Sequence, residues 1–226
     1  MLPRNTLLLL MCSQAIPCYA SITIDPSIDQ SEVVVDSVAV GGVTYQIIGV
    51  EGYPNYLSGE QAGSPSTPFV DHIFLLPPDM QIDQLEIVSA QWDTMPGKYF
   101  LYPAQTGSME DTTFALPDPE IYSSSDPFPS QPVEVTGQDG MMGFGIVHLS
   151  ASPIRYIPSD SLLLVLTSLQ ISLNMGARQF DVIHPERETD WSAARREAAI
   201  LGVIENPEVS TATQFSPVVA NEKSPL

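Results

Sequence analysis

Twenty-one prolines are spread along the 226 residues, and they constrain the fold of this chain more than any other feature. Proline lacks a backbone N–H and clashes with the preceding helical turn, so it disrupts helix interiors and central strands. Here prolines stand between short apolar runs; Pro77-Pro78 end the run Phe69–Leu76, and Pro103 ends the aromatic run Lys98–Tyr102. Short strands joined by rigid turns give this pattern. We therefore predict an all-β fold, an antiparallel β-sandwich.

Two glycine-containing segments predict hairpins. Gly41-Gly42 separates two short apolar runs, and two glycines suit the positive φ angles of a tight turn. Gly137–Gly140 lies between the runs Val133–Val135 and Phe144–Leu149, so we expect a second turn there. Between the hairpins, residues 103–132 are rich in Pro, Ser and Asp and predict a long connection between sheets. The longest apolar run, Leu162–Leu173, is a strand candidate, since twelve residues are too few to span a bilayer as a helix.

The helical pattern comes late in the chain. Asp190 is expected to cap a helix over Trp191–Leu201, ended by Gly202. Trp191, Ala194, Ala198 and Leu201 recur at helical spacing and predict its apolar face. Residues 205–226 lose periodicity and predict a disordered tail. The expected organisation is a signal peptide over 1–20, a β-sandwich over 21–185, a helix over 186–204 and the tail over 205–226.

The N-terminus has the features of a secretory signal peptide. Arg4 supplies the positive charge, Leu7–Met11 the apolar run, and Ala20 a small residue before the cleavage site. We predict cleavage after Ala20 and a secreted or envelope location, compatible with a bacterial protein. Cys12 and Cys18 lie in the removed segment, so the mature chain has no disulfide and no cysteine nucleophile.

The charge balance narrows the range of partners. Eight Lys and Arg stand against 27 Asp and Glu, for a net charge of −19. Such a surface repels phosphate backbones and anionic lipid headgroups, so we expect neither nucleic acid nor, after signal cleavage, a membrane as partner. An apolar content of 43% is enough for a folded core.

No motif for catalysis or metal binding occurs in the sequence. His72, His148 and His184 do not have the spacing of a metal pair such as HExxH, and each is interpreted as a strand or turn residue. The chain has no GxSxG elbow, phosphate-binding glycine loop or DxDxDG calcium loop. We therefore expect no catalytic, cofactor-binding or metal-binding residue. A hydrolase with two carboxylates brought together by the fold stays open as a third hypothesis.

Four short motifs, in order between residues 45 and 175, resemble the propeptides of gingipain-type, caspase-like cysteine peptidases. In each motif, proline and aromatic residues flank strands. They are Gly63–Pro68 followed by Phe69-Val70 and Leu75–Pro77; Tyr102–Gln105; Pro119–Tyr122 with Asp126–Pro129; and Gly143–Leu149 with Pro153–Pro158 leading into Leu162–Leu173. The resemblance implies a β-sandwich prodomain that assists folding of the peptidase and keeps it latent until it is removed.

The resemblance also implies a partner, a caspase-like cysteine peptidase domain in cis or in trans. The family often has a basic residue in the turn before the late strand, where a basic side chain can occupy an Arg- or Lys-specific pocket. This chain has Met141-Met142 there, so its inhibitory contact is expected at Met141, Met142 or Lys98.

The alternative hypothesis is a stand-alone surface or adhesive β-sandwich. It requires an exposed apolar patch or a row of aromatic side chains that binds carbohydrate. The candidate aromatic residues are Tyr53, Tyr56, Trp92, Tyr99 and Tyr102.

Overall fold

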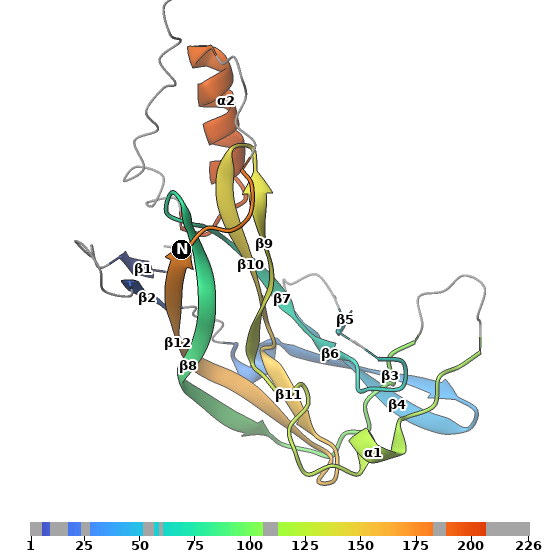
Figure 1. Cartoon of the computed structure of the whole chain (residues 1–226). Helices are drawn as coiled ribbons and strands as arrows, with labels where there is room; N and C mark the ends of the chain where they lie inside the picture. The colour runs from blue at the N-terminus through green and yellow to red at the C-terminus, as the bar shows by residue number, and fades with distance from the viewer. Residues whose placement is uncertain are drawn as a thin grey trace, which may run out of the picture.

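The computed structural model describes residues 6–9, 18–23, 28–51, 57–58, 61–105, 113–182 and 189–206 (Figure 1). The elements in chain order are β1 (Thr6–Leu9), β2 (Cys18–Thr23), the 3-10 turn η1 (Gln30–Glu32), β3 (Val33–Val40), β4 (Val43–Val50), β5 (Leu57–Ser58), β6 (Thr67–Pro68), β7 (Val70–Leu75), β8 (Met80–Met95), α1 (Pro119–Tyr122), β9 (Val133–Met141), β10 (Phe144–Ala151), β11 (Ile154–Ile157), β12 (Leu162–Ala177) and α2 (Asp190–Leu201). The predicted all-β class with a short C-terminal helix is confirmed.

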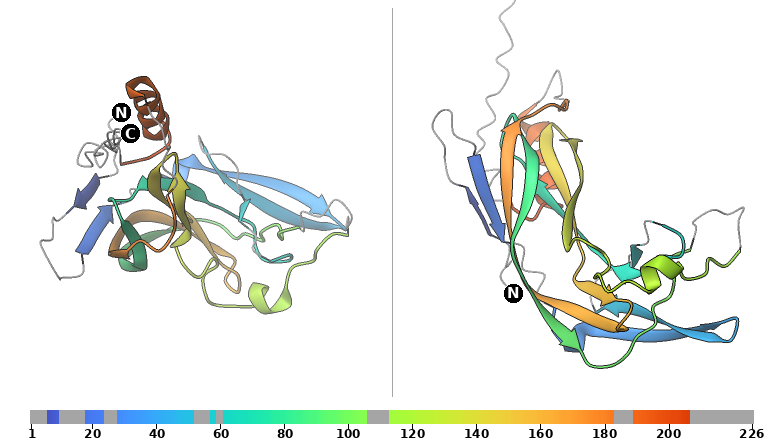
Figure 2. Two further views of the ribbon diagram at one scale, coloured as in Figure 1. Left: turned by 45° about the horizontal axis from the view of Figure 1, so that its top comes forward. Right: turned by 60° about the horizontal axis from the view of Figure 1, so that its bottom comes forward.

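A long antiparallel pair, β8 with β12, runs through the whole molecule. Each strand has sixteen residues, and the pairing extends from Leu163 and Met95 at one end to Ala177 and Met80 at the other. The register shifts three times along the pair, and such irregularities bend a sheet. The ribbon is accordingly curved in both views of Figure 2. The curvature lets one pair of strands take part in two separate cores.

The first core lies where β7, β10 and β9 form a sheet that packs on the second half of the β8–β12 pair. Its fully buried side chains include Phe74, Leu149, Leu166 and Leu173. Along β10 nearly every residue is buried, because this strand is the centre of its sheet and has β7 on one side and β9 on the other. This face-to-face packing is the predicted sandwich.

The second core lies at the other end of the ribbon. There the β3–β4 hairpin and residues 99–101 pack on β11 and on the first half of β12. Ile48, Leu101, Tyr156 and Leu163 are completely buried in it. The predicted aromatic strand over 98–102 is wrong in form: this segment makes a single bridge, Gln46 to Leu101, and is otherwise irregular.

The first predicted hairpin is confirmed and the second is misplaced. Gly41 and Gly42 turn the chain between β3 and β4 with φ of 60° and 85°. The segment Gly137–Gly140 lies inside β9, and the turn comes at Met142-Gly143. Glycine also occurs inside strands where another part of the chain comes too close for a side chain. Gly140 is such a position, because a Cβ there would lie 2.8 Å from the Asp181 carbonyl oxygen.

Helix α2 begins one residue earlier than predicted and buries a different face. Thr189, rather than Asp190, is the N-cap, and its hydroxyl accepts the Ser192 N–H. Trp191 is 70% exposed, whereas Ile200 is fully buried in the first core. Apolar spacing predicted the helix, but the contacts of its last turn decided which side faces the core.

The two residues that open the predicted tail are part of the fold. Asn206 is 1% exposed, and its side-chain amide exchanges two hydrogen bonds with the backbone of Leu75 in β7. The Glu205 N–H donates to the Ile73 carbonyl, and its carboxylate lies 2.6 Å from His72 Nδ1. The segment therefore covers the free edge of β7. The rest of the predicted tail, 207–226, lies outside the described residues.

Parts of the predicted signal peptide are described as backbone only. β1 pairs with β2, and β2 pairs with the edge of β12 over Ile171–Met175. Cleavage after Ala20 stays a prediction. No helix among the described residues has the length and apolarity needed to cross a bilayer.

Candidate functional site

The turn between β9 and β10 is the first candidate contact site, because two of the three predicted contact residues lie there. Met141 ends β9 opposite Phe144, and Met142 and Gly143 form the turn with φ of 54° and 83°. Met141 is half-buried against the first core, whereas Met142 is 48% exposed. Of the two methionines, Met142 is thus the side chain available to a partner. We call Met141–Gly143 the hairpin tip.

Helix α2 braces the hairpin tip. Arg196 Nη1 donates to the Met142 carbonyl at 2.7 Å, and its guanidinium lies 5.0 Å from the centre of the Phe144 ring. Figure 1 shows α2 standing beside the ends of β9 and β10. A charge-assisted hydrogen bond and a cation–π contact hold the backbone of the turn in one place. The backbone of the hairpin tip is therefore held in a fixed position by α2.

Lys98, the third predicted contact residue, lies elsewhere. It follows β8 and is exposed, and its ammonium donates to the Asp160 carbonyl in the turn between β11 and β12. The hairpin tip lies at the other end of the ribbon, near the Ala177 end of β12, since Gly140 contacts Asp181 and Val182. At about 3.3 Å per residue, the sixteen residues of β8 separate the two ends by roughly 50 Å along the strand.

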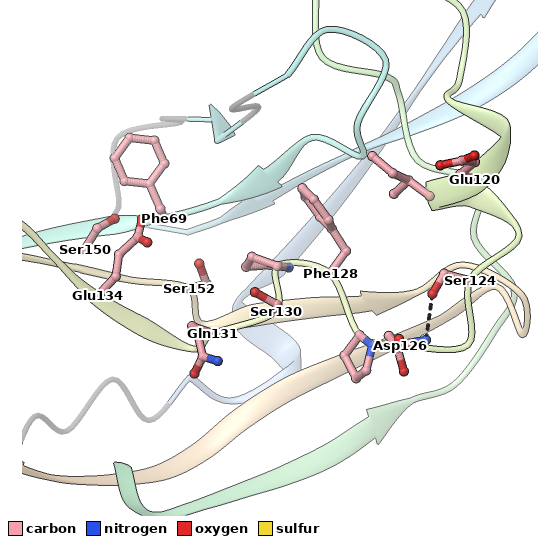
Figure 3. A pocket seen from close by; sticks show the side chains of 13 residues that line it. Phe69, Glu120, Ser124, Asp126, Phe128, Ser130, Gln131, Glu134, Ser150 and Ser152 are labelled. Atoms are coloured by element: carbon pink, nitrogen blue, oxygen red, sulfur yellow. Dashed lines mark hydrogen bonds between the residues drawn. The ribbon is translucent and has the colours of Figure 1, made fainter. Parts of the chain in front are cut away.

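A cavity of about 410 Å³ lies between α1, the loop that follows it and the end of β10. We call it the Phe128 pocket (Figure 3). Helix α1 contributes Glu120, and the loop contributes Ser124 and Asp126–Gln131. Strands β9 and β10 contribute Glu134 and Ser150, which are partners in register. Asp118 caps α1 by accepting the N–H groups of Glu120 and Ile121, which fixes this wall of the pocket.

Arg155 of β11 holds the loop that forms the pocket, although it is not among the lining residues. Its Nε donates to the Pro129 carbonyl at 2.8 Å and its Nη2 to the Ser130 carbonyl at 2.7 Å. The guanidinium also lies 5.4 Å from the centre of the Trp92 ring. Burial lowers the pKa of the Arg155 guanidinium, yet arginine keeps its charge at any physiological pH. Its donors are directed to backbone oxygens of the loop.

Two of the three histidines lie in strands. His72 lies in β7 beside Glu205, and His148 lies in β10. His184 lies outside the described residues. Within the described ranges, no three His, Cys, Asp or Glu side chains are grouped as metal ligands.

The aromatic candidates for a carbohydrate-binding row are packed into the protein. Tyr99 is buried, and Tyr102 contacts Tyr45 and Phe114 edge-on. Trp92 is covered by Arg155. The other two candidates, Tyr53 and Tyr56, lie outside the described residues. Tyr99 thus belongs to the second core and Trp92 packs against the first, so the three described candidates form no open platform.

These features define the class of the chain: a curved antiparallel β-protein with two cores on one long strand pair, closed by a C-terminal helix. Comparison with solved structures finds this fold in the gingipains. The complex of the pro- and mature domains of RgpB from Porphyromonas gingivalis contains a chain that matches 91% of this chain and 98% of its own length, with a TM-score of 0.62 and 14% identity.

A second match is gingipain K from Porphyromonas gingivalis, in a structure that concerns its zymogenic latency. It covers 77% of this chain and 93% of the matched chain, with a TM-score of 0.56 and 19% identity. The scan against protein-family models and the search of curated proteins give no match. The resemblance to gingipain-type propeptides is thus confirmed at the level of the fold.

Sequence reasoning missed the Phe128 pocket. It treated residues 103–132 as a connection, and the pocket walls come from that connection and from strands β9 and β10. The acidic residues at 120, 126 and 134 were visible in the sequence, but no spacing rule brings them together.

Proposed function

We propose that this chain is an exported, non-catalytic prodomain that assists folding of a caspase-like cysteine peptidase and keeps it latent. The observation that carries the proposal is the fold shared with almost the whole length of a chain in the RgpB pro- and mature-domain complex. The likeness to gingipain K in a structure of zymogenic latency supports it. The predicted signal peptide supports export, since it has the charge, apolar run and small residue that such signals need.

Within this proposal, the hairpin tip is the inhibitory contact. Met142 is exposed on a turn that α2 holds in place, so little conformational freedom is lost on binding. Lys98 donates to the Asp160 carbonyl and lies at the far end of the ribbon. One peptidase active site therefore does not reach both Lys98 and the hairpin tip. A methionine side chain suits an apolar subsite, because it is unbranched and adapts to irregular surfaces.

The proposal is tested by titrating the purified chain, beginning at Ser21, against a caspase-like cysteine peptidase from the same source. We expect inhibition at stoichiometric amounts and a higher refolding yield of the peptidase. Unchanged activity together with unchanged refolding yield contradicts the proposal. Inhibition that survives Met142→Asp but is lost in Lys98→Ala assigns the contact to the other end of the molecule.

A further inference from the structure

Helix α2 is attached to the β-sheets through its second half. Of the α2 side chains that the structure describes, Ile200 alone is buried, and Trp191 near the start is 70% exposed. Figure 1 shows α2 extending beyond the ends of β9 and β10. The position of the helix therefore depends on contacts made by its last turns and by the residues that follow it.

The segment after α2 continues the helix without slack. The N–H groups of Val203 and Ile204 both donate to the Ile200 carbonyl, at 3.0 and 3.2 Å. Ile204 packs in the first core, and Glu205 and Asn206 hydrogen-bond to β7. We call Ile204–Asn206 the docked segment. Because a hydrogen-bonded turn joins the two, we expect α2 and the docked segment to open and close as one cooperative unit.

The same unit reaches the hairpin tip through Arg196. This residue lies one helical turn before Ile200, about 6 Å along the axis, and its Nη1 donates to the Met142 carbonyl at 2.7 Å. Met142 has a φ of 54°, a conformation that a residue other than glycine keeps only where its surroundings fix it. The bond from Arg196 and the contact of its guanidinium with the Phe144 ring supply that constraint. A shift of α2 by a few ångströms breaks the bond, because a hydrogen bond is lost beyond about 3.5 Å.

We propose that the docked segment controls the hairpin tip through α2. With the segment docked, Arg196 holds the Met142 carbonyl and the tip keeps one shape; with the segment undocked, α2 moves and the tip loses this constraint. Arg196 and Asn206 are thus positioning residues for the inhibitory contact. Asn206 is 1% exposed, so a partner protein does not touch it, and any effect of its replacement on a partner passes through the fold. The effect on a peptidase rests on the proposed function, whereas the coupling within the chain does not.

The first test measures the coupling from the hairpin tip to the docked segment by amide hydrogen exchange of the purified chain. The Leu75 N–H reports docking, because its acceptor is the Asn206 side chain. Arg196→Met keeps an unbranched apolar stem but removes the donor and the charge. We expect the Leu75 N–H to exchange about tenfold faster, since a charged hydrogen bond that opening must break is already lost. Arg195→Met removes the same charge one position along α2, where the guanidinium lies over the exposed Trp191 ring, and should change this rate by less than about twofold.

The second test measures the coupling in the opposite direction, by nuclear magnetic resonance of the chain labelled with carbon-13 in its methionine methyl groups. Asn206→Ala undocks the segment without altering the tip, so the Met142 methyl signal should move toward its position in Arg196→Met. Ile48→Ala is the matched control, because it also leaves a destabilising defect at a completely buried position, but in the second core, and should leave the Met142 signal in place. An unchanged Leu75 rate in Arg196→Met, or an unchanged Met142 signal in Asn206→Ala, overturns the proposal.

The consequence for latency is measured against a caspase-like cysteine peptidase from the same source. Asn206→Ala is expected to raise the concentration needed for half-inhibition about tenfold, because a tip without its constraint loses conformational freedom on binding. Ile48→Ala should leave that concentration within about twofold. If the wild-type chain does not inhibit, the proposed function fails, while the exchange and methyl measurements still decide the coupling. Equal inhibition by Asn206→Ala and an inhibitory wild type overturns control of the tip by the docked segment.

Discussion

Replacing Asn206 by alanine tests whether the end of the described chain is part of the folded core. The Asn206 amide donates to the Leu75 carbonyl at 2.9 Å and accepts the Leu75 N–H at 2.7 Å. Both residues are almost completely buried, at 1% and 2% exposed. Asn206→Ala removes both partners at once and leaves two backbone groups of β7 without a hydrogen bond.

The expected loss in the free energy of unfolding follows from those two backbone groups of Leu75. A buried donor or acceptor left without a partner costs about 1–3 kcal/mol, so two cost roughly 2–6 kcal/mol. We expect the free energy of unfolding to fall by about 3 kcal/mol, since the shorter side chain at position 206 leaves space that admits water to one of the groups. A domain stability of about 5–15 kcal/mol leaves the variant folded at 25 °C.

The assay is equilibrium unfolding in urea, followed by tryptophan fluorescence, with wild type and variant compared at equal slope. Asn206→Asp retains the acceptor for the Leu75 N–H and places a second acceptor against the Leu75 carbonyl, so a loss at least as large is expected. Glu197→Ala on the exposed face of α2 is the control and should change stability by less than about 0.5 kcal/mol. A fall below about 1 kcal/mol for Asn206→Ala would refute this account of the docked segment.

Three further predictions concern pH, the hairpin tip and the leader. Burial raises the pKa of Tyr122 and Tyr156, so above about pH 10 these tyrosines ionise in the unfolded chain before they ionise in the folded one. The free energy of unfolding should therefore be constant up to about pH 9 and fall above pH 10. Replacing both tyrosines by Phe should reduce this alkaline loss, as measured by urea unfolding at each pH. Met142→Gly should raise the melting temperature in a thermal scan, since φ is 54° there and glycine adopts it without strain; a lower melting temperature would contradict this. A chain beginning at Ser21 should unfold with nearly unchanged stability, because Leu173–Met175 of β12, which pair with residues 18–20, are also paired with β8; a clear loss on truncation would assign the leader a structural role.

The sequence predicted the parts of the fold that local chemistry controls. Gly41-Gly42 predicted its turn correctly because both residues need positive φ in a two-residue hairpin. The late helix was predicted from apolar spacing and from Gly202 at its end, and the proline punctuation predicted short strands and the β class. Each of these depends on residues close to one another in the chain.

Tertiary structure decided everything that depends on residues far apart in sequence. The second turn moved to Met142-Gly143 because Gly140 packs against the segment after β12, which no local pattern contains. The docking of Asn206 depends on Leu75, 131 residues away. The Phe128 pocket joins a helix, a loop and two strands around Ser152, and the separation of Lys98 from the hairpin tip follows from the length of β8. Sequence determined which elements form, because backbone sterics act locally; tertiary packing decided which surfaces meet, because burial brings distant segments together.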